Sequence, residues 1–322
     1  IRNKSGYCTG GILHDGCIDT ARLFAGSEGT LGIITRLKLR TVPLPAFRGL
    51  VQIEFDSMDN TARAVPDILE TDPSAVELMD RTLINLASSS LTEFREAYSP
   101  QAEAVLLVEY EAEDEQSLKA EAQQLCREMQ NKAFKSECIY SSGRQQKLWD
   151  SRKEAVGLIA RRRGKARPVP FIEDVYVRPQ NMPQFISSLR QIGSQMEVDL
   201  SYYGHAGTGD LHIRPFLDLS DPDHVRKMQD LADKVFKLCW SLGGAVSGEH
   251  GDGIVRAGFI KRQYGEDCYN LLRRIKEIFD PSGILNPGKI ITDSACRVPA
   301  DNLKASFRSQ SNFSSDTLQF PE

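Results

Sequence analysis

Two glycine-rich segments contain most of the histidine in this chain, and they indicate where its chemistry would occur. His205 and His212 flank the first glycine-rich turn, and Glu249 and His250 lie in the second. Three of the five histidines are therefore in these two segments. Glycine lets a backbone turn sharply and approach a ligand closely. The segments therefore combine groups that bind metals or transfer protons with backbone suited to a binding site.

Metal binding is the first chemistry that these residues could support. If His205 ends one strand and His212 begins the next, both imidazoles can converge on one point. Glu249 could then supply a carboxylate from the second loop. Two histidines and one carboxylate with open positions suit a catalytic Zn²⁺, Mn²⁺ or Fe²⁺. The alternative is that these are turn glycines with incidental surface histidines.

Three further side chains are candidates for acid–base chemistry and anion binding. In extended backbone the side chain of His250 would point away from that of Glu249, which leaves it free to act as a general base. Arg214 lies two residues beyond His212, so on a strand it would share that face and could grip a carboxylate. Arg152 is a second candidate anion clamp, although most arginines on a charged helix are solvated.

The composition sets limits on the class of protein. The 322 residues are 40% hydrophobic and carry a formal charge of −4, which allows a large core and two subdomains. The mild acidity argues against nucleic-acid binding, and no apolar run reaches membrane-spanning length. Seven scattered cysteines without a CxxC motif indicate reduced thiols. We expect a cytoplasmic protein, a location compatible with peripheral membrane attachment.

Strand and helix patterns alternate twice in similar order along the chain. This alternation predicts an α+β protein with two related β-α-β units of ferredoxin-like style. The patterns predict strands over 31–39, 51–55, 104–111, 134–140, 171–177, 197–203 and 211–217. They predict helices over 60–70, 79–88, 114–132, 144–159, 180–193, 220–242 and 265–279.

Several motifs resemble the FAD-linked oxidases of the vanillyl-alcohol-oxidase type. Residues 24–35, which include Gly-Ser-Glu-Gly-Thr-Leu-Gly, resemble the end of the flavin-binding domain in that family, and 3–7 fit the segment before it. The segments 205–214, 247–253 and 279–290 resemble the family's C-terminal domain. The resemblance covers roughly residues 1–291.

The resemblance implies a fold and a reaction. The expected fold is α+β: an FAD-linked oxidase C-terminal domain with two ferredoxin-like halves, preceded by the edge of a flavin-binding domain. The expected division is 1–45 for that edge, 46–291 for the C-terminal substrate domain and 292–322 for a linker or tail. The implied reaction oxidises a D-2-hydroxy acid, of the glycolate, D-lactate or D-2-hydroxyglutarate class, to the 2-oxo acid by hydride transfer to FAD.

Carried over residue by residue, the resemblance also assigns roles. His205, His212 and Glu249 would bind a divalent metal ion, and His250 would be the catalytic base. The residues that would bind substrate are Arg152, Arg214 and Tyr203. The residues that would bind FAD are Gly26, Ser27, Glu28, Gly29, Thr30, Gly32, Ile33, Asn286 and Lys289.

The sequence departs from the common family pattern at Thr208, Asp210 and Arg214. These departures leave the substrate open, and they resemble a subgroup in which the flavoprotein half continues into an iron–sulfur half. The electron acceptor would then be an iron–sulfur domain or subunit, and a homodimer is also compatible with the resemblance.

The first residue bears on whether the chain is part of a longer protein. Ile1 is not an initiator, so we expect part of a longer polypeptide, and we expect these residues alone to bind FAD weakly.

Two other functions are alternatives to the dehydrogenase. One alternative is a non-catalytic, flavoprotein-like subunit that serves assembly. Another is a metal-dependent hydrolase, although such an enzyme would not need the flavin-domain motif.

Overall fold

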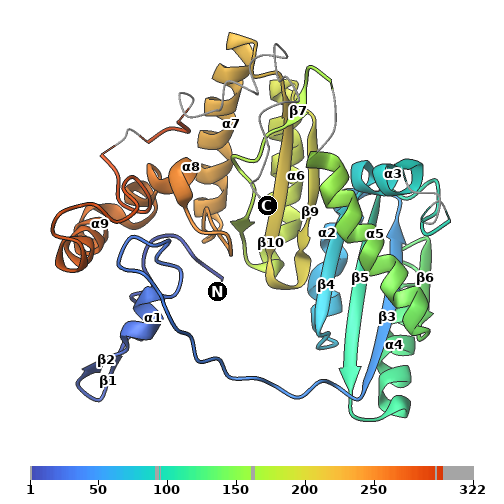
Figure 1. The fold of residues 1–322 in the computed structure, drawn as a ribbon. Helices are drawn as coiled ribbons and strands as arrows, with labels where there is room; N and C mark the ends of the chain where they lie inside the picture. The colour runs from blue at the N-terminus through green and yellow to red at the C-terminus, as the bar shows by residue number, and fades with distance from the viewer. Residues whose placement is uncertain (1, 91–93, 95, 161–163, 294–295, 300–322) are drawn as a thin grey trace, which may run out of the picture.

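An eight-stranded antiparallel sheet forms the centre of the described part of the chain (Figure 1). The computed structural model describes residues 2–90, 94, 96–160, 164–293 and 296–299. The sheet strands are β3 (Phe47–Phe55), β4 (Ala75–Asp80), β5 (Ala104–Ala112), β6 (Lys135–Ile139), β7 (Arg167–Pro168), β8 (Val175–Tyr176), β9 (Leu200–His205) and β10 (Asp210–Leu217). A separate small hairpin pairs β1 (Leu13–His14) with β2 (Cys17–Ile18).

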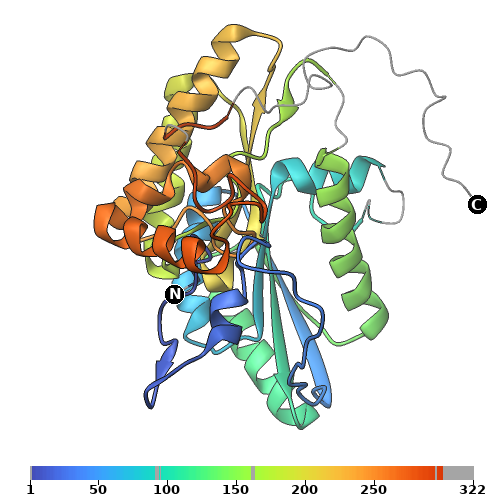
Figure 2. The same cartoon turned by 60° about the vertical axis from the view of Figure 1, so that its left-hand side comes forward.

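Helices cover both faces of this sheet (Figure 2). The described helices are α1 (Thr20–Phe24), α2 (Met58–Leu69), α3 (Arg81–Ser90), α4 (Glu115–Met129), α5 (Ser142–Ala160), α6 (Met182–Met196), α7 (Pro222–Ser241), α8 (Gly253–Ala257) and α9 (Ile260–Phe279), with short 3₁₀ turns η2 (Pro179–Asn181) and η3 (Ala206–Thr208). Buried residues of α2, α4, α6 and α7 share one core with the sheet, whereas α3 and α5 form a second core on the other face.

The sheet consists of two ferredoxin-like halves, which confirms the predicted fold. The first half runs β3-α2-β4-α3-β5-α4-β6, where α3 is an addition to the ferredoxin-like pattern, and its strands lie in the order β6-β3-β5-β4. The second half runs β8-α6-β9-β10-α7 and ends at Ala245, which forms an isolated bridge to Tyr176. Its order is therefore Ala245-β8-β10-β9, the same arrangement as in the first half. The halves join where β4 pairs with β9.

Side-chain alternation along β10 separates a buried face from the face that carries the candidate site. Leu211 and Ile213 are fully buried in the core shared with α6 and α7. The intervening residues His212 and Arg214 must point to the opposite face, since successive side chains alternate on a strand. The helices α3 and α5 pack with the first half on that opposite face, so the polar residues of β10 lie beside them rather than beneath α6 and α7.

One sequence-based prediction of an element was wrong, and two others had inaccurate bounds. Residues 32–40 are extended but pair with no strand among the described residues, and Ile33 and Leu39 are 84% and 77% exposed. A strand needs a neighbour to accept its backbone hydrogen bonds, which a local pattern cannot supply. The helix predicted over 79–88 begins only at Arg81, because Met79 and Asp80 complete β4. The strand predicted over 171–177 is reduced to β8.

The N-terminal segment packs against α9 in a third core cluster. Tyr7, Leu23 and Leu31 are buried against Ile260 and Leu272. Figure 1 shows this segment beside α8 and α9, followed by the long extended connection to β3. Residues 2–31 therefore lie against the C-terminal elements rather than against the first half of the sheet.

Candidate functional site

The two candidate histidines lie on one tight hairpin. His205 ends β9 and pairs with Asp210, and His212 in β10 pairs with Tyr203. The turn closes at Gly209, whose φ is +79°, and a Cβ there would lie 1.8 Å from the carbonyl oxygen of Val177. Only glycine fits this contact. The hairpin predicted from the sequence is therefore present, and it places both imidazoles on the same face of the sheet.

We predict that Gly209→Ala destabilises the protein by more than about 2 kcal/mol, because it adds a backbone clash to the strain of a positive φ. Gly243→Ala is the matched control: its φ is +69° but a Cβ there meets no heavy atom within 4 Å. The control should cost only the left-handed conformation, about 1–2 kcal/mol. Urea unfolding measures both values, and equal losses would contradict the clash.

Asp174 brings the second loop to this hairpin. Its buried carboxylate accepts hydrogen bonds from Ser247 Oγ (2.6 Å) and from the backbone N–H groups of Glu249 (2.7 Å) and His250 (3.0 Å). Asp174 also has a positive φ of +68°, an uncommon conformation for a residue with a side chain. The loop is therefore folded around one carboxylate, which fixes the positions from which Glu249 and His250 project.

The three predicted metal ligands converge. Glu249 Oε1 lies 3.3 Å from His205 Nε2 and 3.6 Å from His212 Nε2. All three donor atoms lie within 4.8 Å of one another. Donors at about 2.0–2.2 Å from a tetrahedral ion are about 3.4 Å apart, so the observed spacing suits such an ion. The remaining oxygen of Glu249 contacts Arg2 Nη1 at 3.3 Å, which leaves Oε1 directed towards the histidines.

The two histidine rings are held in different ways. His205 Nδ1 lies 2.5 Å from Glu77 Oε1, and this hydrogen bond raises the pKa of His205. The ring of His212 lies between Tyr203, at a centroid distance of 4.9 Å, and His250, at 5.1 Å. Burial lowers the pKa of His212 to about 3, so this ring is neutral near pH 7, as a metal ligand must be.

His250 lies on the same side as Glu249, so the expectation that the two side chains point apart was wrong. The bent loop turns the ring of His250 onto His212, with an interplanar angle of 9°. Its Nε2 is 3.3 Å from Glu249 Oε1, and its Nδ1 is 3.6 Å from Glu173 Oε1. The contact with Glu173 is the largest cause that raises the pKa of His250. A candidate proton acceptor therefore lies directly beside the candidate metal ligands.

Both candidate anion clamps reach this site, and each is paired with a carboxylate. Arg152 of α5 is only 17% exposed and forms an ion pair with Glu77, so it is not the solvated arginine that its charged helix suggested. Arg214 forms an ion pair with Glu173 and donates from Nε and Nη2 to the hydroxyl of Tyr203. This pattern leaves Nη1 of Arg214 for a ligand.

The predicted flavin-binding turn lies against the loop that carries Glu249 and His250. The carboxylate of Glu28 accepts hydrogen bonds from the N–H groups of Asp252 (2.6 Å) and Gly253 (2.9 Å), and Asn286 Nδ2 donates to the Glu28 carbonyl (2.6 Å). The Thr30 hydroxyl donates to Ser27 O. These groups therefore connect segments of this chain, and a role in FAD binding stays a prediction.

The remaining predicted flavin residues present open surface. Gly26 and Gly29 have positive φ, and a Cβ at Gly26 would meet no heavy atom within 4 Å. Ile33 is largely exposed, and Lys289 is half-buried. A Cβ at Gly32 would meet the edge of the Phe24 ring at 2.9 Å, so the ring would have to shift to admit a side chain there.

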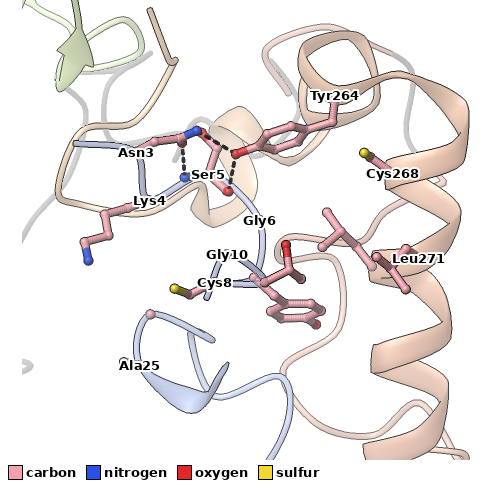
Figure 3. Close-up of a pocket in the computed structure, with 14 residues that line it drawn as sticks. Asn3, Lys4, Ser5, Gly6, Cys8, Gly10, Ala25, Tyr264, Cys268 and Leu271 are labelled. Atoms are coloured by element: carbon pink, nitrogen blue, oxygen red, sulfur yellow. Dashed lines mark hydrogen bonds between the residues drawn. The ribbon is translucent and has the colours of Figure 1, made fainter. Parts of the chain in front are cut away.

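A pocket of about 270 Å³ lies beside this turn (Figure 3). The N-terminal segment and α9 line it, together with Ala25 and Gly26. Tyr264 hydrogen-bonds to Asn3 Nδ2 and to the Ser5 carbonyl, which fixes one wall. Its volume is small for a dinucleotide, so it can hold only part of such a ligand.

Sequence reasoning missed three acidic residues that organise the site: Glu77, Glu173 and Asp174. Glu77 is one of two charged residues in strand β4, the other being Asp80, and a charged residue needs a polar partner once it is buried. Glu173 and Asp174 are adjacent acids directly before β8. Glu173 and Asp174 lie within the strand predicted over 171–177, where two adjacent acids could have drawn attention, whereas no strand was predicted around Glu77.

The comparison with protein families identifies this arrangement. Residues 44–290 match the family described as "FAD linked oxidases, C-terminal domain". The chain belongs to this family. The family therefore supports FAD as the cofactor and an oxidoreductase enzyme class.

Relatives and solved structures agree with this assignment. The chain is 34% identical over 288 residues to a D-2-hydroxyglutarate dehydrogenase of Pantoea ananatis, covering 85% of this chain and 28% of that protein. It is 28% identical over 291 residues to glycolate oxidase subunit GlcD of Bacillus subtilis, covering 88% of this chain and 59% of that protein. The chain thus spans about 28% of the length of the first relatives.

A solved structure of p-cresol methylhydroxylase shares the fold, with a TM-score of 0.53 and 14% identity, covering 77% of this chain and 53% of that one. An alkyldihydroxyacetonephosphate synthase structure gives a TM-score of 0.55 at 15% identity, covering 86% and 51%. In the described part of the chain, no helix has the length and apolar character needed to cross a bilayer.

Proposed function

We propose that this chain is part of a flavin-dependent dehydrogenase that oxidises a D-2-hydroxy acid to the 2-oxo acid. The single observation that carries the proposal is the convergence of His205, His212 and Glu249 within an FAD-linked oxidase C-terminal domain, with His250 beside them. The relatives named D-2-hydroxyglutarate dehydrogenase and glycolate oxidase subunit support this substrate class.

A divalent ion fits the donor set of His205, His212 and Glu249. The spacing of the donor atoms and the neutral state of His212 both suit Zn²⁺, Mn²⁺ or Fe²⁺. Such an ion lowers the pKa of a coordinated hydroxyl group, which favours its deprotonation. Within the proposal, these three residues hold the ion.

The flavin side of the site would be formed by the turn Gly26–Ile33 together with Asn286 and Lys289. The open backbone at Gly26 and the exposed side chain of Ile33 suit contact with a large planar ligand. FAD, when bound, accepts the hydride from the substrate's Cα. The hydrogen bonds of Glu28 to the neighbouring loop would keep the flavin turn at a fixed position relative to His250.

Side chains of this protein would bind the substrate carboxylate and accept the hydroxyl proton. Arg152 and Arg214 attract the substrate carboxylate. Nη1 of Arg214, which makes no hydrogen bond to the described residues, can donate while Nε and Nη2 hold Tyr203 and Glu173. The substrate's hydroxyl proton passes to His250 Nε2. Loss of that proton and of the Cα hydride together convert the 2-hydroxy acid into the 2-oxo acid.

Anaerobic flavin reduction tests this function in the flavin-loaded, full-length protein of which we propose this chain is part. We expect D-2-hydroxyglutarate, D-lactate or glycolate to bleach the flavin, whereas L-2-hydroxyglutarate should leave it oxidised. If none of these acids reduces the flavin, the proposal is wrong. A non-catalytic assembly subunit or a metal-dependent hydrolase would then remain, and ester or peptide hydrolysis that depends on His250 would identify the hydrolase.

The electron acceptor, the assembly and the cellular location complete the proposed function. The electron acceptor is an iron–sulfur domain or subunit, to which residues 292–322 would lead; of these, 294–295 and 300–322 lie outside the described residues. The division at residues 45 and 291, a homodimeric assembly and a cytoplasmic location that allows peripheral membrane attachment are parts of the same proposal.

A further inference from the structure

Two carboxylates stand behind the histidines of this site in the same way. Glu77 on β4 contacts Nδ1 of His205, and Glu173 before β8 faces Nδ1 of His250. In both rings the other nitrogen, Nε2, is 3.3 Å from Glu249 Oε1. The two carboxylates therefore direct two different rings towards one shared point.

Each carboxylate is itself fixed by an arginine. Glu77 pairs with Arg152 of α5, and Glu173 pairs with Arg214 of β10. Both glutamate side chains are at most 16% exposed, so water competes little for them. A carboxylate that is held by an arginine and aimed at an imidazole fixes both the tautomer and the orientation of that ring.

We propose that Glu77 and Glu173 are positioning residues with separate tasks. Glu77 orients His205 for metal binding, and Glu173 orients His250 for proton transfer. The inference rests on the proposed function for the second task, since that function makes His250 the base. The two residues are not interchangeable, because Glu77 lies behind a metal ligand whereas Glu173 lies behind the neighbouring ring.

The distances support this division. Glu77 makes a full hydrogen bond to His205 at 2.5 Å, as expected for the outer partner of a metal-bound imidazole. Glu173 is 3.6 Å from His250, slightly beyond hydrogen-bonding range. Contacts of catalytic bases are often long before the substrate binds and shorten in the complex. The free ring of His250 is therefore guided by Glu173 and still able to adjust.

The test compares Glu77→Ala with Glu173→Ala. Glu77→Ala should weaken Zn²⁺ binding by about 10–100-fold, measured by calorimetry on the chain, as for other outer partners. Glu173→Ala should leave Zn²⁺ affinity within about 3-fold of wild type. It should instead lower the limiting rate of flavin reduction by about 10-fold or more, with little change in the substrate concentration giving half-maximal rate.

Three further measurements keep the roles distinguishable. Glu173→Gln retains an acceptor oxygen for Nδ1–H and should restore part of the rate. Nitrogen NMR of the ring of His250 should show loss of the Nδ1–H tautomer in Glu173→Ala, a readout that does not depend on any activity. Glu103→Gln is the matched control, because it removes the ion pair of Glu103 with Arg81 away from the site. It should change neither the Zn²⁺ affinity nor the rate of flavin reduction.

The outcomes separate this inference from the proposed function. Equal losses of Zn²⁺ affinity in Glu77→Ala and Glu173→Ala would overturn the division of tasks, and so would an unchanged His250 tautomer in Glu173→Ala. Suppose that wild type binds Zn²⁺, Glu77→Ala loses Zn²⁺ affinity and Glu173→Ala loses the Nδ1–H tautomer of His250, but no 2-hydroxy acid reduces the flavin. Then the two glutamates still orient their rings, and the proposed function fails.

Discussion

Replacing His250 with alanine should slow flavin reduction by roughly 10²–10⁴-fold, the range typical for loss of a general base. The ring lies against His212 and beside Glu249, where a metal-held hydroxyl group would lose its proton. Without it, water must accept that proton. Stopped-flow bleaching of the flavin-loaded protein with D-2-hydroxyglutarate or D-lactate measures the rate.

The metal content distinguishes a base from a ligand. Under the proposed function, His250→Ala keeps its metal ion, because His205, His212 and Glu249 remain. If His250→Ala instead loses both metal and activity, His250 is a metal ligand. Asp174 and Glu249 have oxygens close enough to His250 to complete such a site. His14→Ala alters an exposed histidine on the distant hairpin and should change neither quantity.

Removing His205 or His212 should abolish stoichiometric metal binding. Each ring supplies one of three donors, so its loss should cost more than the roughly 10–100-fold that loss of an outer partner costs. Elemental analysis of His205→Ala and His212→Ala after dialysis against Zn²⁺ measures this directly. The activity of the flavin-loaded protein should fall in parallel.

His224 provides the control for these variants. It lies on α7, where its Nδ1 accepts a hydrogen bond from the backbone of Asp218, away from the donor set. His224→Ala should therefore retain the wild-type metal content. Equal metal content in wild type, His205→Ala and His212→Ala would show that these residues bind no ion.

Local sequence patterns predicted most helices and the hairpin, because their signals are short-range. Asp221 caps α7 and Pro222 occupies its first turn, as the sequence indicates. The strand β4 was missed because its Glu77 and Asp80 make it look polar, although it lies at the centre of the sheet. Residues 32–40 show the converse, since their pattern is strand-like while no described strand pairs with them.

The convergence of His205, His212 and Glu249 could be expected from the sequence, because the two histidines flank one glycine-rich turn and Glu249 lies in another, and glycine lets the backbone turn sharply. The roles of Glu77 and Glu173 could not be predicted in the same way. Their positions depend on the pairing of β4 with β9 and on the approach of residue 173 to β10, contacts between segments far apart in sequence. Such contacts leave no periodic signal in the chain.

The junction between β4 and β9 has a further consequence for the cooperativity of unfolding. Only two residue pairs, Leu78 with Gly204 and Met79 with Tyr203, define its register. Glu77 next to this junction belongs to the first half, whereas His205 and His212, two of the proposed metal donors, belong to the second. An ion held at 100 times its dissociation constant would add about 2.7 kcal/mol to native stability. Buried residues of both halves already share one core, so under the proposed function the ion would add to an existing coupling, and chelation would lower the stability of the two halves together.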